Sequence, residues 1–192
     1  MQKSTYGNRL RIYHYLWRCA QKGPGLQMST FTEIVKENDK LLRKLYKQVY
    51  DVPGKGFQCI TCGIWTPALE IGHLYGRDNK AVRFHFHCTA PQCRSCNNKN
   101  NGERRFYEWM VRYRYGKDAF SNVLKAKHRD AKTPFMQQIN DDLNFLIAQN
   151  LTNKEFLKRI GQKNKPLSFD EIKDIRKAGL WEDEWKTMLN HF

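Results

Sequence analysis

The sequence predicts an α+β fold, in which a small strand-containing centre is flanked by helices on its N-terminal and C-terminal sides. Apolar residues recur at helical spacing in residues 8–22 and 30–50, and again after residue 94. Residues 57–92 have no helical period and contain short β-branched or aromatic runs, which are typical of strands. Four of the six cysteines form two close pairs at the ends of this centre, which indicates that a bound metal ion stabilises it.

Two helices are expected before the centre. Residues 8–22 form the first, and Gly23-Pro24-Gly25 ends it. Thr30 and Glu33 form a capping box that opens the second helix, which continues to about Tyr50. We expect its buried face to consist of Ile34, Leu41, Leu42, Leu45 and Val49. Its exposed basic face carries Lys36, Lys40, Lys44 and Lys47.

The centre begins after the turn-rich segment 53–56, and we expect strands in residues 57–60, 68–73 and 82–86. Helix returns at Arg94 and continues, bent around Gly102, to Tyr115. Residues 118–132 form a basic helix or extended arm. The tail contains three short helices: one in residues 134–149, one capped by Thr152 with Glu155, and one capped by Ser168 with Glu171. A last amphipathic stripe follows, consisting of Trp181, Trp185 and Leu189.

This pattern divides the chain into an N-terminal basic helical segment (1–52), a metal-bound core (53–116) and a C-terminal helical region (117–192). The formal net charge is +15, and residues 136–192 contain nine basic and nine acidic residues, so the whole excess lies in the first 135 residues. Such an asymmetry indicates a polyanion-binding body with a neutral appendage. No apolar run is long enough to cross a membrane, and residues 1–17 lack the apolar region of a secretion signal. We therefore expect a cytoplasmic protein without a membrane partner.

The paired cysteines form two knuckles, Cys59-x-x-Cys62 and Cys93-x-x-Cys96. Two such turns supply four thiolates for one tetrahedral Zn²⁺, and disulfides are disfavoured in a reducing cytoplasm. The segment between them is too short and polar to bury a core of its own, so we expect the zinc to be structural. Cys88 competes as a ligand, although a small buried side chain is the better interpretation. Cys19 is expected in the core of the first helix.

A histidine and an asparagine accompany the knuckles. The chain order is knuckle, His73, knuckle, Asn97. A neutral imidazole can take a proton from water, and an amide oxygen can bind a hard divalent cation. We expect the zinc to tie strand and helix together, so that the two side chains face one another.

The stretch from Cys59 to Gly116 resembles the NinG (Rap) family of phage recombination proteins, HNH-type, ββα-metal nucleases that act on branched DNA. The matching elements are Cys59-x-x-Cys62-Gly63, Gly72-His73, Arg83-Phe84, Gln92-Cys93-x-x-Cys96-Asn97, Gly102, Tyr107 and Tyr115-Gly116. The order of motifs is also similar, more distantly, to that of phage endonuclease VII resolvases. The resemblance implies a zinc-stabilised, HNH-like core with His73 as general base and Asn97 as ligand of a catalytic Mg²⁺ or Mn²⁺.

The chain departs from these patterns beside the catalytic ion. Endonuclease VII has an aspartate ligand immediately before its histidine, where this chain has Gly72. The NinG family often has asparagine at the position of Cys88, and acids at those of His85 and His87. A second ligand is therefore open, and the candidates are Glu70, His85 and His87. Glu70 and His87 are equally good candidates for this ligand. Glu70 stands three residues before His73, so a strand would place it on the opposite face and a turn would be needed to bring the two together.

Basic side chains near the centre are the candidates for DNA contacts. Arg83 suits a bidentate phosphate clamp, with a surface salt bridge as the alternative. His85 and His87 alternate on one face of the expected strand, where both could bind the catalytic ion or both could contact phosphate, and His85 is counted among the candidate DNA contacts. Contacts to the DNA backbone are expected from Arg104, Arg105, Arg112 and Arg114.

Together these features predict a metal-dependent endonuclease that nicks branched or structured DNA, such as Holliday junctions and D-loops. A symmetric junction needs two cuts, so we expect a homodimer, with the C-terminal helices as the dimer surface or as a surface for a recombination partner. If the chain is phage-encoded, it would act in the host cytoplasm. The alternative is a non-catalytic zinc-knuckle DNA-binding protein, which would need neither His73 nor Asn97. A sequence-specific homing or restriction enzyme is a weaker third option.

Overall fold

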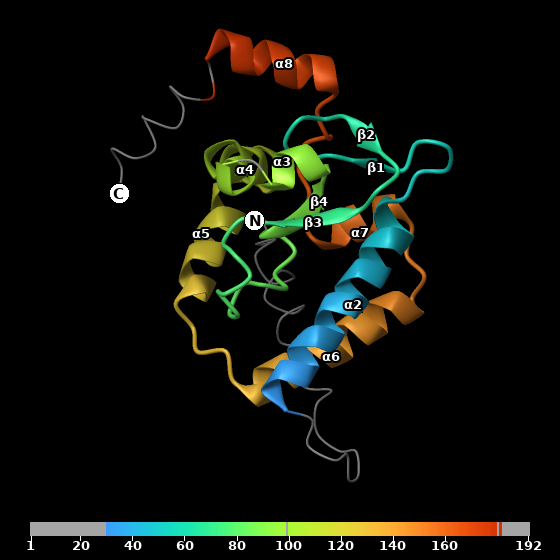
Figure 1. Ribbon diagram of the computed structural model, residues 1–192, viewed down its shortest axis with the longest axis vertical. Helices are drawn as coiled ribbons and strands as arrows, with labels where there is room; N and C mark the ends of the chain where they lie inside the picture. The colour runs from blue at the N-terminus through green and yellow to red at the C-terminus, as the bar shows by residue number, and fades with distance from the viewer. Residues whose placement is uncertain (1–29, 99, 180, 182–192) are drawn as a thin grey trace, which may run out of the picture.

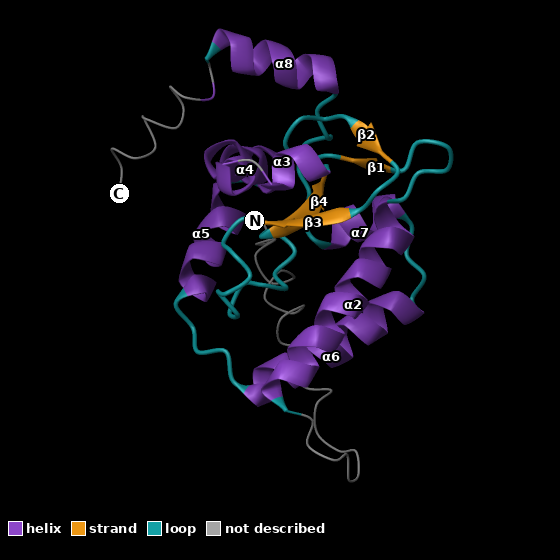
Figure 2. Ribbon diagram, in the orientation of Figure 1, coloured by secondary structure: helices purple, strands orange, loops and turns teal. Residues whose placement is uncertain are grey.

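The computed structural model describes residues 30–98, 100–179 and 181 of the chain. They form an α+β fold with two antiparallel two-stranded sheets among helices (Figures 1 and 2). The expected helix in residues 8–22, Cys19, Trp185 and Leu189 lie outside the described residues. The elements are α2 (Phe31–Tyr50), β1 (Phe57–Gln58), β2 (Trp65–Thr66), β3 (Glu70–His73), β4 (Thr89–Gln92), α3 (Arg94–Asn98), α4 (Asn100–Tyr115), α5 (Lys117–Lys127), α6 (Thr133–Ala148), α7 (Asn153–Arg159) and α8 (Phe169–Ala178).

Helix α2 begins where its capping box predicts. Thr30 accepts a hydrogen bond from the Glu33 backbone at 3.3 Å, and the Glu33 carboxylate accepts one from the Thr30 backbone at 2.8 Å. Two otherwise unpaired helix-end donors are satisfied in this way. The apolar stripe expected from the sequence is buried, and the four lysines expected on the other face are exposed.

The buried stripe of α2 packs against α6, which comes from the C-terminal part of the chain. Figure 1 shows the two helices side by side. Their shared core contains Met136, Leu143 and Leu146 of α6, and it also includes Phe156 of α7. Inside this core Asn38 donates to the Met136 carbonyl at 2.9 Å, and Asn140 donates to Asn38. The N-terminal and C-terminal segments distinguished in the sequence thus form one packed layer.

Strands β3 and β4 form the hairpin at the centre of the molecule. They pair antiparallel, with Glu70 opposite Gln92 and His73 opposite Thr89. Figure 1 shows the hairpin between α3 and α4 on one side and α2 with α6 on the other. Ile71 belongs to the core shared by α2 and α6, and Tyr107 of α4 donates to the Gly72 carbonyl at 3.2 Å.

The strand expected in residues 82–86 is not formed. This segment is a series of tight turns, in which the backbone N–H of His85 donates to Val82 and that of Cys88 donates to His85. Its apolar side chains predict a strand, but they are buried in two different cores: Val82 lies in the core under α4, and Phe84 lies in the core under α2. The strand that pairs with β3 is instead Thr89–Gln92, although Pro91 lies inside it.

Helices α4 and α5 cover the other side of the hairpin. Their core includes Leu74, Tyr75 and Ala90 of the hairpin region, with Phe106 and Met110 of α4. Helix α4 ends at Tyr115, and Gly116 follows with a positive φ of 86°. The expected arm in residues 118–132 is helix α5 and a short connection.

The three tail helices form as expected. Both predicted capping boxes are present, at Thr152 with Glu155 and at Ser168 with Glu171, and Gly179 ends α8 in the left-handed conformation with φ of 67°. Trp181 packs edge-on against Phe106 at a ring distance of 5.4 Å, so this member of the expected C-terminal stripe is used inside the chain. None of the helices in the described ranges combines the length and apolar character needed to cross a membrane.

Candidate functional site

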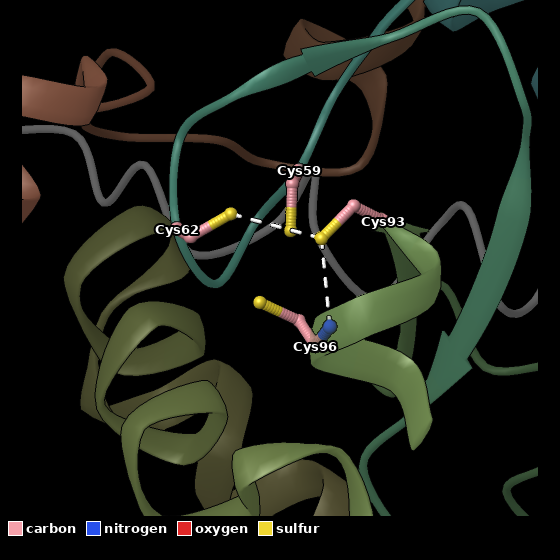
Figure 3. Close-up of side chains that lie close together, drawn as sticks. All are labelled: Cys59, Cys62, Cys93 and Cys96. Atoms are coloured by element: carbon pink, nitrogen blue, oxygen red, sulfur yellow. Dashed lines mark hydrogen bonds between the residues drawn. The ribbon is translucent and has the colours of Figure 1, made fainter. Parts of the chain in front are cut away.

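The four knuckle cysteines come together from two separate turns (Figure 3). Cys59 and Cys62 lie in the turn between β1 and β2, Cys93 directly follows β4, and Cys96 lies in α3. Gly63 closes the first turn with φ of 74°, and its backbone N–H donates to the Cys59 carbonyl at 2.9 Å. A side chain at this position would also collide with the backbone of Ser168 and Phe169, so this glycine lets the knuckle pack against the start of α8.

The geometry of the four sulfurs fits a tetrahedral Zn²⁺. All four Sγ atoms lie within 4.8 Å of one another, and those of Cys62 and Cys93 are 3.8 Å apart. A tetrahedron with Zn–S distances of about 2.3 Å has sulfur–sulfur edges of about 3.8 Å. The backbone N–H of Cys96 points at Cys93 Sγ at 3.4 Å, a contact that stabilises a thiolate. These residues can therefore hold a structural zinc.

Within the cluster the negative charge is favoured on Cys59, and contacts with Cys59 raise the pKa values of Cys62 and Cys96. Hydrogen bonds from the Cys62 and Cys96 thiols lower the pKa of Cys59 to about 2, against the opposing effect of burial. Thiolates are the form that binds zinc. Cys88 is separate from the cluster: it is buried in the core under α4, and burial raises its pKa well above the ordinary value. The expectation that Cys88 is a small core residue is thus confirmed.

His73 is the last residue of β3 and is oriented by its own strand. Its Nδ1–H donates to the Ile71 carbonyl at 3.1 Å, which leaves Nε2 as the acceptor nitrogen. Nε2 is buried and has no hydrogen-bond partner. Burial, together with the nearby charges of Arg77 and Arg83, lowers the pKa of His73 to about 4. The imidazole is therefore neutral at pH 7, with a free lone pair.

Asn97 lies in α3 and contacts Glu70 rather than His73. Its Nδ2 donates to the Glu70 carboxylate at 2.8 Å. Glu70 and Gly72 share one face of β3, while Ile71 and His73 share the other, because side chains alternate along a strand. The structure therefore does not join His73 and Asn97 as the sequence led us to expect. It brings together Asn97 and Glu70 instead.

Gly72 has no room for a side chain. A Cβ there would collide with Oε1 of Gln92. Gln92 is buried, and its Nε2 donates to the Thr61 hydroxyl in the first knuckle. The aspartate that precedes the histidine in endonuclease VII would have to displace Gln92 in this packing. Glu70 is two residues earlier on the same face of β3, and its carboxylate is the acid that lies beside Asn97.

His85 and His87 are held away from this pair. His87 donates from Nε2 to the Ile160 carbonyl at 2.8 Å, and its ring lies 4.5 Å from that of Tyr115. His85 accepts a hydrogen bond from the His87 backbone, and burial with the charges of His87 and Arg129 lowers its pKa to about 3. His85 is therefore uncharged at neutral pH, which does not suit the phosphate contact expected of it.

Arg83 is a structural residue rather than a phosphate clamp. It is 8% exposed, its Nε and Nη2 bond both carboxylate oxygens of Asp39 at 3.0 and 2.5 Å, and its Nη1 donates to the Arg77 carbonyl at 2.7 Å. The guanidinium fork is thus occupied on both sides. The salt-bridge interpretation that the sequence left open is the one that the structure supports, with Arg83 buried and Asp39 partly exposed.

The arginines of α4 divide into two groups. Arg104 and Arg105 are exposed, and Arg104 forms an ion pair with Glu108 at 3.2 Å. Arg114 is only 4% exposed, and Arg112 is half-buried with its guanidinium 4.0 Å from the ring centroid of Phe120. Contacts from Arg114 to DNA are therefore excluded in this conformation, because its side chain lies inside the fold.

A groove between α2 and β3 leads to His73 and was not expected from the sequence. It has a volume of about 240 Å³ and is lined by Asp39, Lys40, Leu42, Arg43, Ile71, His73 and Arg77. Lys40 was expected on the exposed basic face of α2, and no motif in the sequence marks Arg43 or Arg77 as a binding residue. The basic character of residues 1–50 was the available signal, but the packing angle of α2 on β3 decides which cations reach the groove.

Fold and site define an α+β protein with a centre of four cysteines that could hold a metal ion. In the described part of the chain, no other group of three or more His, Cys, Asp or Glu side chains is close enough to hold an ion. No protein-family model, curated protein or solved structure matches the chain.

Proposed function

We propose that the protein is a metal-dependent endonuclease of the HNH type that nicks branched or structured DNA during phage recombination, as members of the NinG family do. The observation that carries the proposal is the state of His73. Its Nδ1–H is held by the Ile71 carbonyl, and its neutral Nε2 is unpaired beside a groove lined by cations. A buried acceptor without a partner is costly, and a water molecule or substrate atom that reached Nε2 from the groove would satisfy it.

The chemistry proposed for His73 is general-base catalysis. Nε2 accepts a proton from water, the water oxygen bonds to phosphorus, and the bond from phosphorus to the leaving sugar oxygen breaks. The ring is neutral at pH 7 and can accept the proton, but a pKa of about 4 makes it a weak base, so the mechanism requires the negative charge of a bound phosphate to raise that pKa. The Ile71 carbonyl stabilises the imidazolium that results, since it accepts from Nδ1–H throughout.

Glu70 and Asn97 supply oxygen ligands of the kind that Mg²⁺ and Mn²⁺ prefer. The carboxylate and carboxamide are already in contact, and a half-turn of the Asn97 amide places its oxygen beside the carboxylate. A divalent ion bound there would stabilise the negative charge that builds on the phosphate. Of the three candidates for a second ligand, Glu70 is favoured over His85 and His87 because it lies beside Asn97.

Both groups can serve one DNA strand although they leave β3 on opposite faces. An acidic ligand immediately before a histidine, as in endonuclease VII, also places ligand and base on alternate faces of a strand. In the described part of the chain, β3 pairs with β4 along one edge and has no strand on the other. A DNA backbone that follows this second edge can meet side chains from both faces. The sequence of a hairpin followed by α3 agrees with a ββα core.

The charge distribution supports a DNA substrate. The net charge of +15 favours binding through release of counterions from phosphates, so affinity should fall steeply with salt. Two cuts in a symmetric junction require two sites, and a homodimer would supply them.

The test is a cleavage assay with zinc-loaded protein, Mg²⁺, a four-way junction and a matched linear duplex. We expect the parent to nick the junction and His73→Ala to lose at least about 100-fold in rate. Zinc content and melting temperature serve as folding controls for the variant. Equal cleavage by parent and His73→Ala would refute the mechanism. Salt-dependent DNA binding by the parent with no cleavage at any Mg²⁺ or Mn²⁺ concentration would instead support the non-catalytic DNA-binding alternative.

A further inference from the structure

The groove between α2 and β3 is strongly basic. Three of its lining residues are cations, Lys40 and Arg43 from α2 and Arg77 from the loop after β3. The one acid in the lining is Asp39, and both of its carboxylate oxygens accept hydrogen bonds from Arg83. Its negative charge is therefore neutralised by a residue that is not part of the lining. A groove with net positive charge and a low-dielectric floor concentrates anions.

The cations of α2 have donors to offer. Arg43 uses one N–H for the Leu69 carbonyl at 2.8 Å, and a guanidinium carries five in all. Lys40 forms an ion pair with Glu37 at 3.1 Å, but the Lys40 side chain is 77% exposed and such surface pairs are weak and exchangeable. Binding an anion in the groove would therefore not require a buried interaction to break.

The groove is also lined by His73, whose acceptor nitrogen makes no hydrogen bond. This nitrogen, Nε2, is buried. The volume of about 240 Å³ corresponds to about eight water molecules at roughly 30 Å³ each, which is room for a phosphate group and its water. Three cations and an imidazole among the lining residues suit a phosphodiester together with an attacking water.

We propose that this groove binds a backbone phosphate of DNA, and that Arg43 and Lys40 of α2 hold the phosphate against His73. The assignment rests on the proposed nuclease function and adds to it a binding element outside the segment from Cys59 to Gly116, where the family resemblance lies. Helix α2 is then a wall of the active site as well as part of the core. Phosphate contacts of this kind fix the position of the DNA without reading its sequence.

The test compares two double variants of α2 that remove equal charge. Lys40→Gln with Arg43→Gln alters the groove, whereas Lys44→Gln with Lys47→Gln alters exposed residues of the same helix that do not line it. The probe is a fluorescent four-way DNA junction, titrated with zinc-loaded protein in buffer without Mg²⁺ and without chelator, at several salt concentrations. Melting temperature confirms that both variants fold.

We expect the groove variant to bind the junction about tenfold or more weakly than the parent, because charge-assisted hydrogen bonds are lost. The slope of log affinity against log salt should fall by about 1 to 2, one unit for each phosphate contact removed. The control variant should change affinity less than about threefold. Equal binding by the groove variant and the parent would overturn the assignment, and so would an equal loss in the control.

The two proposals fail in different ways. A parent that binds the junction through the groove but never cuts it refutes the nuclease and leaves the phosphate site standing. A parent that cuts the junction, with binding unaffected in the Lys40/Arg43 variant, refutes the phosphate site and leaves the nuclease standing.

Discussion

The ion pair between Arg83 and Asp39 connects the turns after β3 to helix α2. We predict that Arg83→Gln lowers the free energy of unfolding by about 2 to 3 kcal/mol. The loss should be smaller than for a fully buried pair, because the Asp39 side chain is 37% exposed and water can solvate it. Urea denaturation measures the change. Arg105→Gln, at an exposed position, should change stability by less than about 0.5 kcal/mol, and a similar effect of both substitutions would contradict the structural role.

Gly72 is required by the close approach of Gln92. We predict that Gly72→Ala lowers the free energy of unfolding by about 1 to 3 kcal/mol. The new methyl group would displace the buried Gln92 side chain, which donates a hydrogen bond to Thr61. Gly76→Ala, four residues later in the sequence, is the matched control, since a Cβ there has nothing within 4 Å. Thermal unfolding of the two variants gives the comparison, and equal melting temperatures would show that Gln92 can move aside freely.

Stability should depend on pH through the buried histidines. Burial lowers the pKa of His73 to about 4 and that of His85 to about 3, so the unfolded chain takes up protons more readily than the folded one below pH 6.5. Above about pH 6.5 both histidines are neutral in the folded and unfolded chain, and the fold has its full stability. As the pH falls from 6.5 toward 4, protonation of the unfolded chain lowers that stability. We expect about 2 kcal/mol of destabilisation per histidine between pH 7 and pH 5. Urea unfolding at the two pH values tests this, and a flat profile would contradict it.

At the scale of elements, the cysteine cluster joins the β1–β2 turn to the end of β4 and the start of α3. We predict one zinc per chain in the parent and its loss in Cys96→Ser, with a marked fall in melting temperature, because metal binding contributes directly to folding. Cys88→Ala is the control: it should keep the zinc and lose only about 1 kcal/mol through the small cavity it leaves. Metal analysis by mass spectrometry measures both, and zinc retained in Cys96→Ser would contradict a four-thiolate site.

The elements that could be predicted are those with local signals. The three capping boxes at Thr30, Thr152 and Ser168 mark helix starts through residues three positions apart, and all three form. Residues 82–86 have the apolar content of a strand but form turns, because their side chains enter two cores contributed by distant helices. Strand β4 contains Pro91, which is a poor strand residue, and its partner β3 determines its conformation.

At the scale of the whole molecule, the hairpin lies where the two cores meet. One core joins α2 to α6 and includes Ile71 of β3, and the other lies under α4 and α5 and includes Ala90 of β4. The cluster of four cysteines could be predicted because the spacing within each pair is local. The groove at His73 and the contact between Asn97 and Glu70 could not, because they depend on how α2 and α3 pack against opposite sides of β3.

The central claim is that one metal ion holds the frame while a second lies beside Glu70 and Asn97. A crystal of the zinc-loaded protein soaked in Mn²⁺, with anomalous data at both absorption edges, tests it most directly. We predict a zinc peak among Cys59, Cys62, Cys93 and Cys96, and a separate manganese peak within coordination distance of the Glu70 carboxylate and the Asn97 amide. A manganese peak elsewhere, or none at saturating Mn²⁺, would contradict the account.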